Sequence, residues 1–223
     1  MASTFDQVRA ADVRRRLAAA SETESAIFDA TERLLATVAL HDLNVAQVIE
    51  AAGISRATFY RYFTSKDAVV SGLLARAMDE VFVAIANFFS TEEPQRAAAP
   101  TALEAALSDA WNVFARHIPV MRAVSENWHR VPELKALWLS IVDRFVAAIA
   151  GQIDRERDAG LAPAGINSAQ LAAMLVWSTE RFMYIASGPE PGPLHSVEGT
   201  LPAVIVLWRQ AIYGGTTADT DRG

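Results

Sequence analysis

The sequence has no cysteine among its 223 residues. This absence excludes disulfide bonds, thiol nucleophiles and thiolate zinc sites, and it is consistent with a reducing compartment. Glycine and proline are scarce, with 11 and 9 residues, and they cluster between long segments instead of recurring every ~10 residues as in β-sandwiches. Because 52% of the residues are nonetheless hydrophobic, these absences favour an all-helical protein whose core suffices for folding without crosslinks.

Long hydrophobic runs are also missing. No uninterrupted apolar stretch approaches the ~20 residues that a membrane-spanning helix needs. The N-terminus begins MASTFDQVRAADVRRR, which places charges where a signal peptide has its apolar centre. We therefore expect a cytoplasmic protein with no membrane partner.

The sequence contains no phosphate-binding glycine loop, no nucleophile elbow and no HExxH motif. The four histidines lack metal-ligand spacing. Asp154, Glu156 and Asp158 alternate as the ligands of an EF-hand loop do, but on a helix side chains at this spacing do not converge on one ion. We interpret this charged run as solvated surface. We expect no enzymatic activity, no cofactor and no metal site.

Charge is unevenly distributed along the chain. The formal net charge is −6, yet residues 1–66 contain eight basic and eight acidic side chains, so the acidity belongs to the C-terminal part. Residues 53–66 contain Arg56, Arg61 and Lys66 and no acidic residue. A local excess of +3 in an acidic protein marks a segment that suits a polyanion.

Helical periodicity and capping residues predict about nine helices. The first four are expected over 21–40, where Ser21 and Glu24 have capping-box spacing, and over 44–52, 56–63 and 65–89. A loop is expected at 91–100, followed by helices that begin at Thr101, Pro119 and Pro132, the last reaching 159, and by helices over 167–187 and 198–213.

These elements predict four regions. Residues 1–20, with Arg14, Arg15 and Arg16, are interpreted as a flexible arm, and 21–66 as a three-helix DNA-binding domain. Residues 67–213 are expected to form a ligand-binding and dimerisation domain, in which 67–89 is a connecting helix. Residues 214–223 are expected to be a disordered tail.

The segment LNVAQVIEAAGISRATFYRYFTSKDAV contains the strongest signal. Asn44 is a good N-cap for one short helix, Gly53 can adopt the left-handed conformation at its end, and Ser55 can cap the next helix. The Ala-Gly-Ile-Ser turn between them is short enough to force a steep crossing. The segment is typical of a helix-turn-helix that binds DNA.

The second of these helices has two faces. Phe59 and Phe63 are four residues apart and are expected to point inward, which leaves six side chains outward: Arg56, Ala57, Thr58, Tyr60, Arg61 and Tyr62. Guanidinium groups can pair with guanine, the methyl groups of alanine and threonine suit thymine, and tyrosine hydroxyls reach phosphates. We expect Lys66 to contact phosphate, and we also count Asn44 among the candidate DNA contacts.

Positions 52–67 resemble the DNA-binding signature of the TetR family of transcriptional regulators. The matching features are the Ala-Gly-Ile-Ser turn, Thr58 and Tyr60, the Tyr62–Phe63 pair and the Ser-Lys-Asp start of the following helix. The resemblance implies a homodimer that places two such helices in successive major grooves. It implies base contacts from Arg56, Ala57, Thr58 and Arg61, and phosphate contacts from Tyr60, Tyr62 and Lys66.

All five tryptophans lie after residue 100, on several predicted helices. Large rings on converging helices can simply fill a core, but together they favour an apolar cavity. Short matches such as Leu137–Trp138, Glu180–Arg181 and Leu207–Trp208 are similar to a mycobacterial branch of the same family, whose members have an elongated hydrophobic ligand tunnel.

The resemblance implies that Phe114, Trp138, Phe145 and Trp208 line such a tunnel. It also places Thr179 where the relative has a ligand-binding asparagine, and a threonine hydroxyl offers fewer hydrogen bonds than an amide. The full set of expected ligand contacts is Leu107, Trp111, Phe114, Trp138, Ile141, Phe145, Val176, Thr179, Met183 and Trp208.

We expect dimerisation through the last two helices, with an apolar surface made by Leu171, Leu175, Phe182, Val204, Leu207 and Ala211. The predicted function is a repressor that an elongated hydrophobic small molecule releases from double-stranded operator DNA. The alternatives are an enzyme, which the absent motifs disfavour, and a small-molecule carrier without DNA binding, which the intact segment 52–67 disfavours.

Overall fold

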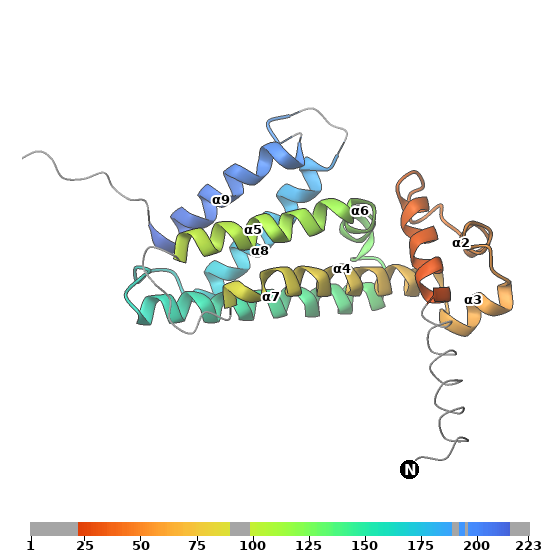
Figure 1. Ribbon diagram of the computed structural model, residues 1–223, viewed down its shortest axis with the longest axis horizontal. Helices are drawn as coiled ribbons and strands as arrows, with labels where there is room; N and C mark the ends of the chain where they lie inside the picture. Colours follow the sequence, from red (N-terminus) through yellow and green to blue (C-terminus); the bar gives the residue numbers. More distant parts are fainter. Residues whose placement is uncertain (1–21, 90–98, 189–191, 195, 215–223) are drawn as a thin grey trace, which may run out of the picture. The chain divides into compact units, whose positions relative to one another are not determined.

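The computed structural model describes residues 22–89, 99–188, 192–194 and 196–214, and the regular structure within these ranges is entirely helical (Figure 1). A first helix covers 22–35. The other eight are α2 (Val45–Ala52), α3 (Arg56–Tyr62), α4 (Lys66–Phe89), α5 (Ala99–Arg116), α6 (Ile118–Asn127), α7 (Pro132–Asp158), α8 (Ser168–Ala186) and α9 (Val197–Tyr213). The predicted all-helical fold is confirmed, with nine helices in the described ranges.

Several expectations lie outside the described residues. These are the N-terminal arm with its three arginines, the Ser21 cap of the first helix, most of the loop at 91–100 and the tail beyond Gly214.

The chain divides into two compact units, Met1–Leu74 and Ala75–Gly223, and the division falls inside α4. In the described part of the first unit, the helix over 22–35, α2, α3 and the start of α4 enclose an apolar core. Its most completely buried members include Ile27, Val48, Phe59, Val70 and Leu73. This core holds α3 in place because Phe59, at the centre of α3, is one of its members.

A close helix contact in this unit depends on Gly72. A Cβ atom at this position would lie 2.8 Å from two ring carbons of Phe28, and the Phe28 ring also packs 5.3 Å from the ring of Phe63. The missing side chain therefore lets the Phe28 ring of the first helix lie directly against α4.

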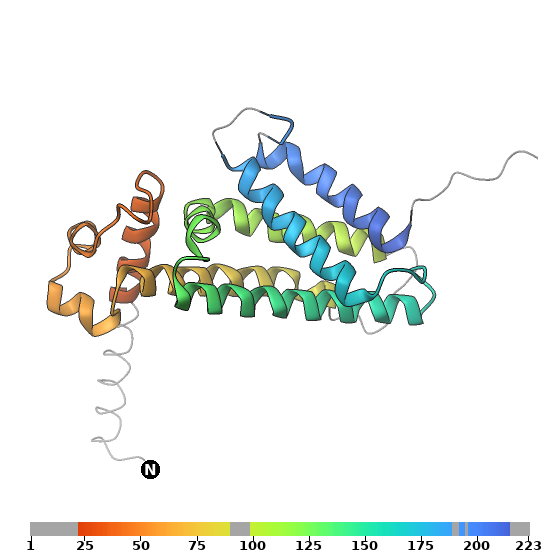
Figure 2. The ribbon, with the colours of Figure 1, turned by 180° about the vertical axis from the view of Figure 1, so that it is seen from behind.

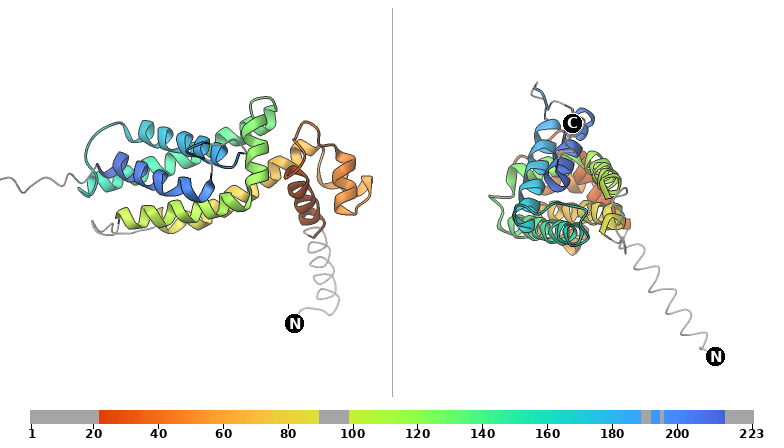
Figure 3. Two further views of the ribbon diagram at one scale, coloured as in Figure 1. Left: turned by 90° about the horizontal axis from the view of Figure 1, so that it is seen from above. Right: turned by 90° about the vertical axis from the view of Figure 1, so that its left-hand side faces the viewer.

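The second unit is a bundle made of the rest of α4 and α5–α9. Figures 2 and 3 show α8 and α9 next to each other on one side of this bundle. By length and composition alone α7 could cross a membrane. In the bundle, its Leu134, Trp138 and Ile141 are buried, so that one face of α7 packs into the core of the unit.

Two predicted helix boundaries were wrong. The first helix ends at residue 35 instead of 40, because residues 36–43 turn to bury Leu40 and Leu43. Helix α5 begins at Ala99, so Thr101 lies inside its first turn and is not an N-cap. The predicted starts near Pro119 and at Pro132 are confirmed, since both prolines occupy the first turn of their helices.

The interpretation of the charged run at 154–158 as solvated surface was wrong for Glu156. This side chain is 1% exposed, and its Oε1 accepts a hydrogen bond of 2.8 Å from Nε2 of Gln152. Burial and the neighbouring Glu156 carboxylate raise the pKa of the Tyr213 hydroxyl. Gln152 and Glu156 therefore form a buried polar pair near Tyr213 at the end of α9, whereas Asp154 and Asp158 are exposed, as predicted.

The expected dimer surface also needs correction. Leu171, Leu175 and Val204 are at most 5% exposed and belong to the core of the second unit. The large apolar side chains that α8 and α9 do expose are Met174, Ile185, Val206 and Leu207. Three of the six predicted residues are therefore buried within the unit, while α8 and α9 expose other large apolar side chains.

Candidate functional site

Helices α2 and α3 are joined by a turn with fixed ends. Asn44 and Gln47 form a capping box at the start of α2, with N–H to side-chain oxygen distances of 3.1 and 2.8 Å. At the end of α2, Gly53 adopts the left-handed conformation with φ of 65°. Ser55 then caps α3 by accepting a 3.0 Å hydrogen bond from the backbone N–H of Thr58. These caps leave the turn little freedom, so the orientation of α3 is defined locally.

The two faces of α3 are separated as the sequence predicts. Phe59 is fully buried, and its ring packs 6.2 Å from that of Phe63. Among the predicted DNA contacts on this helix, Arg56, Ala57, Tyr60 and Arg61 are exposed, while Thr58 and Tyr62 are half-buried. The exposed face thus combines guanidinium, methyl and phenol groups without an acidic side chain between 53 and 66.

Each arginine of α3 lies against a tyrosine of the same helix. The Arg56 guanidinium lies 5.4 Å from the centre of the Tyr60 ring, and the Arg61 guanidinium lies 5.1 Å from that of Tyr62. The same arginines approach the phenol oxygens of these tyrosines at 3.5 and 3.3 Å. Stacking of this kind restricts the long arginine side chains before any partner arrives.

Lys66 does not present its ammonium group outward as a phosphate contact should. Its Nζ donates to the backbone oxygens of Leu40 and Leu43 at 2.6 Å each and to that of His41 at 3.4 Å. All three N–H bonds of the ammonium are used inside the first unit. In this structure Lys66 fixes the turn that leads into α2, a role that the sequence did not predict.

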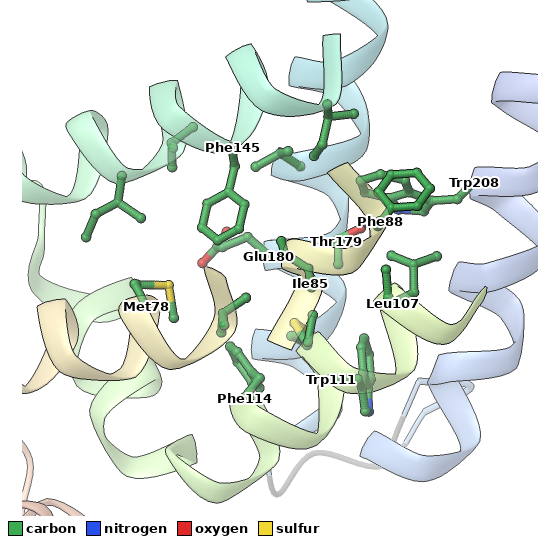
Figure 4. A pocket seen from close by; sticks show the side chains of 18 of the residues that line it. Met78, Ile85, Phe88, Leu107, Trp111, Phe114, Phe145, Thr179, Glu180 and Trp208 are labelled. Carbon is green, nitrogen blue, oxygen red and sulfur yellow. Dashed lines mark hydrogen bonds between the residues drawn. The ribbon is translucent and has the colours of Figure 1, made fainter. Parts of the chain in front are cut away.

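The second unit contains an apolar cavity of about 150 Å³ (Figure 4). All ten residues predicted as ligand contacts line it: Leu107, Trp111, Phe114, Trp138, Ile141, Phe145, Val176, Thr179, Met183 and Trp208. They come from α5, α7, α8 and α9. Of the five tryptophans, Trp128 and Trp177 do not line the cavity and instead pack against each other with ring centres 6.2 Å apart.

Sequence reasoning missed the wall that α4 provides. Met78, Val81, Ile85, Phe88 and Phe89 line the cavity from this helix. The sequence predicted them only as part of the connecting helix over 67–89. The signal was present in the sequence, because apolar residues at helical spacing, among them Val81, Ile85 and Phe88, continue beyond the first unit and must be buried in the second.

The cavity wall has few polar groups. The Trp208 indole Nε1 donates a 2.8 Å hydrogen bond to the Thr179 hydroxyl, so that hydroxyl is partly occupied within the wall. Glu180 also lines the cavity and is only 9% exposed. Its Oε1 accepts a 2.5 Å hydrogen bond from Ser125. Glu180 was not among the predicted ligand contacts, although a carboxylate between Val176 and Met183, on the same face of the helix, was a sign of a buried polar site.

A charged cluster joins α4 to the end of α5 and to the residue that precedes α6. Glu80 Oε2 lies 3.2 Å from Arg116 Nη2 and 3.4 Å from His117 Nε2. Partial burial of Glu80 opposes ionisation, but the hydrogen bonds and positive charges of Arg116 and His117 outweigh it and lower the pKa of Glu80. Among the described residues, no group of three or more His, Asp or Glu side chains converges as a metal site.

Comparison with known proteins gives a consistent result for both units. Residues 27–73 match the model of the bacterial regulatory proteins of the tetR family, and residues 103–214 match the C-terminal domain of transcriptional regulator EthR. The HTH-type transcriptional regulator EthR of Mycolicibacterium smegmatis is 32% identical over 193 residues, which cover 86% of this chain and 87% of the relative. EthR of Mycobacterium tuberculosis is 31% identical, with 86% and 88% covered.

Solved structures share the fold at lower sequence identity. A TetR-family transcriptional regulator from Syntrophomonas wolfei has a TM-score of 0.73 at 14% identity and covers 89% of this chain and 99% of its own. The fatty acid degradation regulator FadR from Bacillus halodurans has a TM-score of 0.68 at 16% identity, with 87% and 96% covered.

Proposed function

Because this chain belongs to the TetR family of DNA-binding transcriptional regulators, we propose that it is a homodimeric repressor released from its operator by an apolar small molecule. The family is one of regulators and not of enzymes. The observation that carries the proposal is the exposed face of α3, in which two arginines stacked on tyrosines occur in a stretch without acidic residues.

For DNA recognition, we assign Arg56 and Arg61 to base edges, since a guanidinium can pair with O6 and N7 of guanine. Ala57 and Thr58 can contact thymine methyl groups. The phenol groups of Tyr60 and Tyr62 suit phosphate oxygens. These tyrosines also hold the two guanidinium groups, so base and phosphate contacts would form together as α3 enters the major groove.

Asn44 and Lys66 differ from these six residues because both already make hydrogen bonds within the first unit. The Asn44 side-chain oxygen is engaged in the capping box, which leaves its amide N–H groups to donate to a phosphate. Lys66 supports DNA binding indirectly by holding the carbonyls of residues 40, 41 and 43. Its charge adds to the positive potential of the segment without a direct contact.

The cavity in the second unit supports a small-molecule inducer. Its wall is almost entirely apolar and contains aromatic rings from several helices, as ligand pockets commonly do. One wall is α4, whose chain continues into the DNA-binding unit. If a ligand binds better to the conformation that binds DNA poorly, operator DNA must weaken ligand binding by the same factor.

The outward faces of α8 and α9 support a homodimer. Met174 and Ile185 on α8, and Val206 and Leu207 on α9, are between 40% and 63% exposed. Such large apolar side chains on adjacent helices suit a four-helix interface between two copies, and two copies are what a two-fold operator requires. We also propose that the protein acts in the cytoplasm, where a bacterial regulator meets its operator DNA.

The test is fluorescence anisotropy with the intergenic DNA upstream of the protein's own gene, measured over a series of salt concentrations. We expect specific binding that weakens steeply with salt, since each neutralised phosphate contributes about −0.9 to the slope of log affinity against log salt. Binding no tighter than to a scrambled duplex at every salt concentration would refute the proposal.

The dimer is tested with Leu207→Glu, which places a carboxylate on the exposed stripe of α9. We expect sedimentation to show a dimer for the wild type and a folded monomer for the variant, with operator affinity reduced at least about tenfold because the second half-site is lost. Glu198→Leu on the first turn of the same helix adds apolar surface and serves as the matched control. A Leu207→Glu variant that remains dimeric would contradict this assignment of the interface.

A further inference from the structure

We propose that Glu180 selects the ligand of the cavity, so that the inducer is an apolar molecule with an amine or hydroxyl donor and without a carboxylate at that end. The inference rests on the proposed ligand-binding function and specifies the chemistry of the same cavity. It starts from a carboxylate that is nine-tenths buried in a wall that is otherwise almost entirely apolar.

The protein satisfies only part of the hydrogen-bonding capacity of Glu180. A carboxylate can accept about four hydrogen bonds. Oε1 accepts one from Ser125 at 2.5 Å. Within the described residues, the nearest charged partner of Oε2 is the Arg181 guanidinium at 3.8 Å, which is ion-pair distance but beyond a hydrogen bond. Oε2 therefore has room for a donor from a ligand.

Arg181 compensates the charge of Glu180 only partly. Its side chain is 52% exposed and also lies over the Tyr184 ring, with 5.0 Å between the guanidinium and the ring centre. Solvent therefore screens the pair from one side. A buried carboxylate whose counter-charge is screened gains from a second cation or donor on the cavity side.

The position of Glu180 in the cavity defines which end of the ligand it contacts. Figure 4 shows its carboxyl oxygens on the same side of the cavity as Phe145 and Met78, whereas Thr179 lies near Phe88 and Trp208. The Thr179 hydroxyl already accepts the Trp208 indole N–H. The Thr179 hydroxyl and the Glu180 carboxylate therefore offer a ligand different contacts, and the stronger hydrogen-bond acceptor, Glu180, lies near Phe145.

Other polar atoms of the wall do not change this preference. The indole Nε1 atoms of Trp111 and Trp138 are buried and have no hydrogen-bond partner among the described residues. They are neutral donors, which suit an ether or carbonyl oxygen of a ligand. A ligand carboxylate near Glu180 would instead lose its hydration and meet a like charge.

The test uses three probes with the same apolar body: 4-phenylbutylamine, 4-phenylbutan-1-ol and 4-phenylbutyrate. Their binding to the purified full chain at pH 7 is followed by calorimetry and by the fluorescence of the tryptophans that line the cavity. For the wild type we expect the amine to bind at least about tenfold tighter than the carboxylate, with the alcohol between them, since hydrogen bonds to charged groups are the strong ones.

The Glu180→Gln variant should remove or reverse this order, because a neutral amide can donate to the carboxylate probe and attracts the ammonium less. Glu126→Gln is the matched control: it is the next carboxylate along α6 from Ser125, pairs with Arg122 at 3.3 Å and does not line the cavity. Thermal unfolding without probes establishes that both variants fold.

The outcomes separate the two proposals. An amine preference that Glu180→Gln abolishes and Glu126→Gln retains supports the selection by Glu180. Equal binding of the three probes, or an order that survives Glu180→Gln, overturns the selection but leaves the cavity as a ligand site. If none of the three probes binds to the wild type, the proposed cavity function fails and the selection fails with it.

Discussion

Replacing Lys66 by methionine distinguishes a structural role from a phosphate contact. Methionine keeps an unbranched side chain of similar length but has no donor and no charge. The variant leaves the carbonyls of Leu40, His41 and Leu43 without their shared donor. If Lys66 is an internal clamp, the variant must lose stability in the absence of DNA.

The expected loss follows from the geometry. The bonds to Leu40 and Leu43 are 2.6 Å long and partly buried, whereas the 3.4 Å contact with His41 is exposed and weak. A hydrogen bond to a charged group contributes about 1.5–3 kcal/mol, and partial exposure of Lys66 favours the lower end. We therefore expect the free energy of local opening around residues 40–53 to fall by about 2–3 kcal/mol.

Hydrogen exchange measured by mass spectrometry reports this opening directly. Amides of α2 should exchange roughly 30- to 150-fold faster in Lys66→Met, as a change of about 1.4 kcal/mol is tenfold. Lys135→Met removes the other lysine of the chain, which is exposed on α7, and should change nothing in α2. Unchanged exchange in Lys66→Met, together with a salt slope of DNA binding reduced by about one, would refute the clamp and restore the phosphate contact.

Three further predictions concern single side chains. Arg61→Ala should reduce discrimination between the operator and mismatched sites by about 1–3 kcal/mol in competitive anisotropy, while Arg130→Ala, on an exposed turn of the second unit, should not; unchanged discrimination would exclude Arg61 from base recognition. Gly72→Ala should destabilise the first unit by about 1–3 kcal/mol in denaturant unfolding because its Cβ would meet the Phe28 ring at 2.8 Å. The control is Gly151→Ala, whose Cβ would meet only the end of Arg155 at 3.5 Å, and equal effects of the two would contradict the proposed contact. Glu80→Gln should lower the free energy of unfolding at neutral pH, and the difference from wild type should shrink as the pH falls. The reason is that the lowered pKa of Glu80 stabilises the fold above the ordinary carboxyl range, and this contribution is lost as the pH falls through the lowered pKa. A difference that does not depend on pH would rule out the ion cluster as its cause.

The helix-turn-helix was predictable because its determinants are local. Asn44, Gly53 and Ser55 act within a few residues of their own positions, and each has the capping role that its residue type predicts. The spacing of Phe59 and Phe63 likewise fixes the inward face of α3. The internal contacts of Lys66 were not predictable for the complementary reason: its three acceptors lie 23 to 26 residues away along the chain, and no local pattern reveals them.

The cavity illustrates a different limit. Aromatic residues on converging helices predicted the lining from α5, α7, α8 and α9, because large rings on several helices leave space between them. The contribution of α4 depends on which face of that helix meets the second unit, as in the stacked rings of Phe82 and Phe145, 4.1 Å apart. That contact joins residues 63 positions apart and is fixed by tertiary packing alone.

The burial of Glu156 and Glu180 was not predicted from the sequence, since acidic side chains are rarely buried unless they are paired. Both have internal donors supplied by other side chains: Gln152 for Glu156, and Ser125 for Glu180. The two carboxylates differ in what surrounds them. Glu156 belongs to a cluster that joins the ends of α7 and α9, whereas Glu180 borders a cavity. Only the second arrangement lets a ligand complete the set of hydrogen bonds, which is why the ligand chemistry of this regulator is inferred from Glu180.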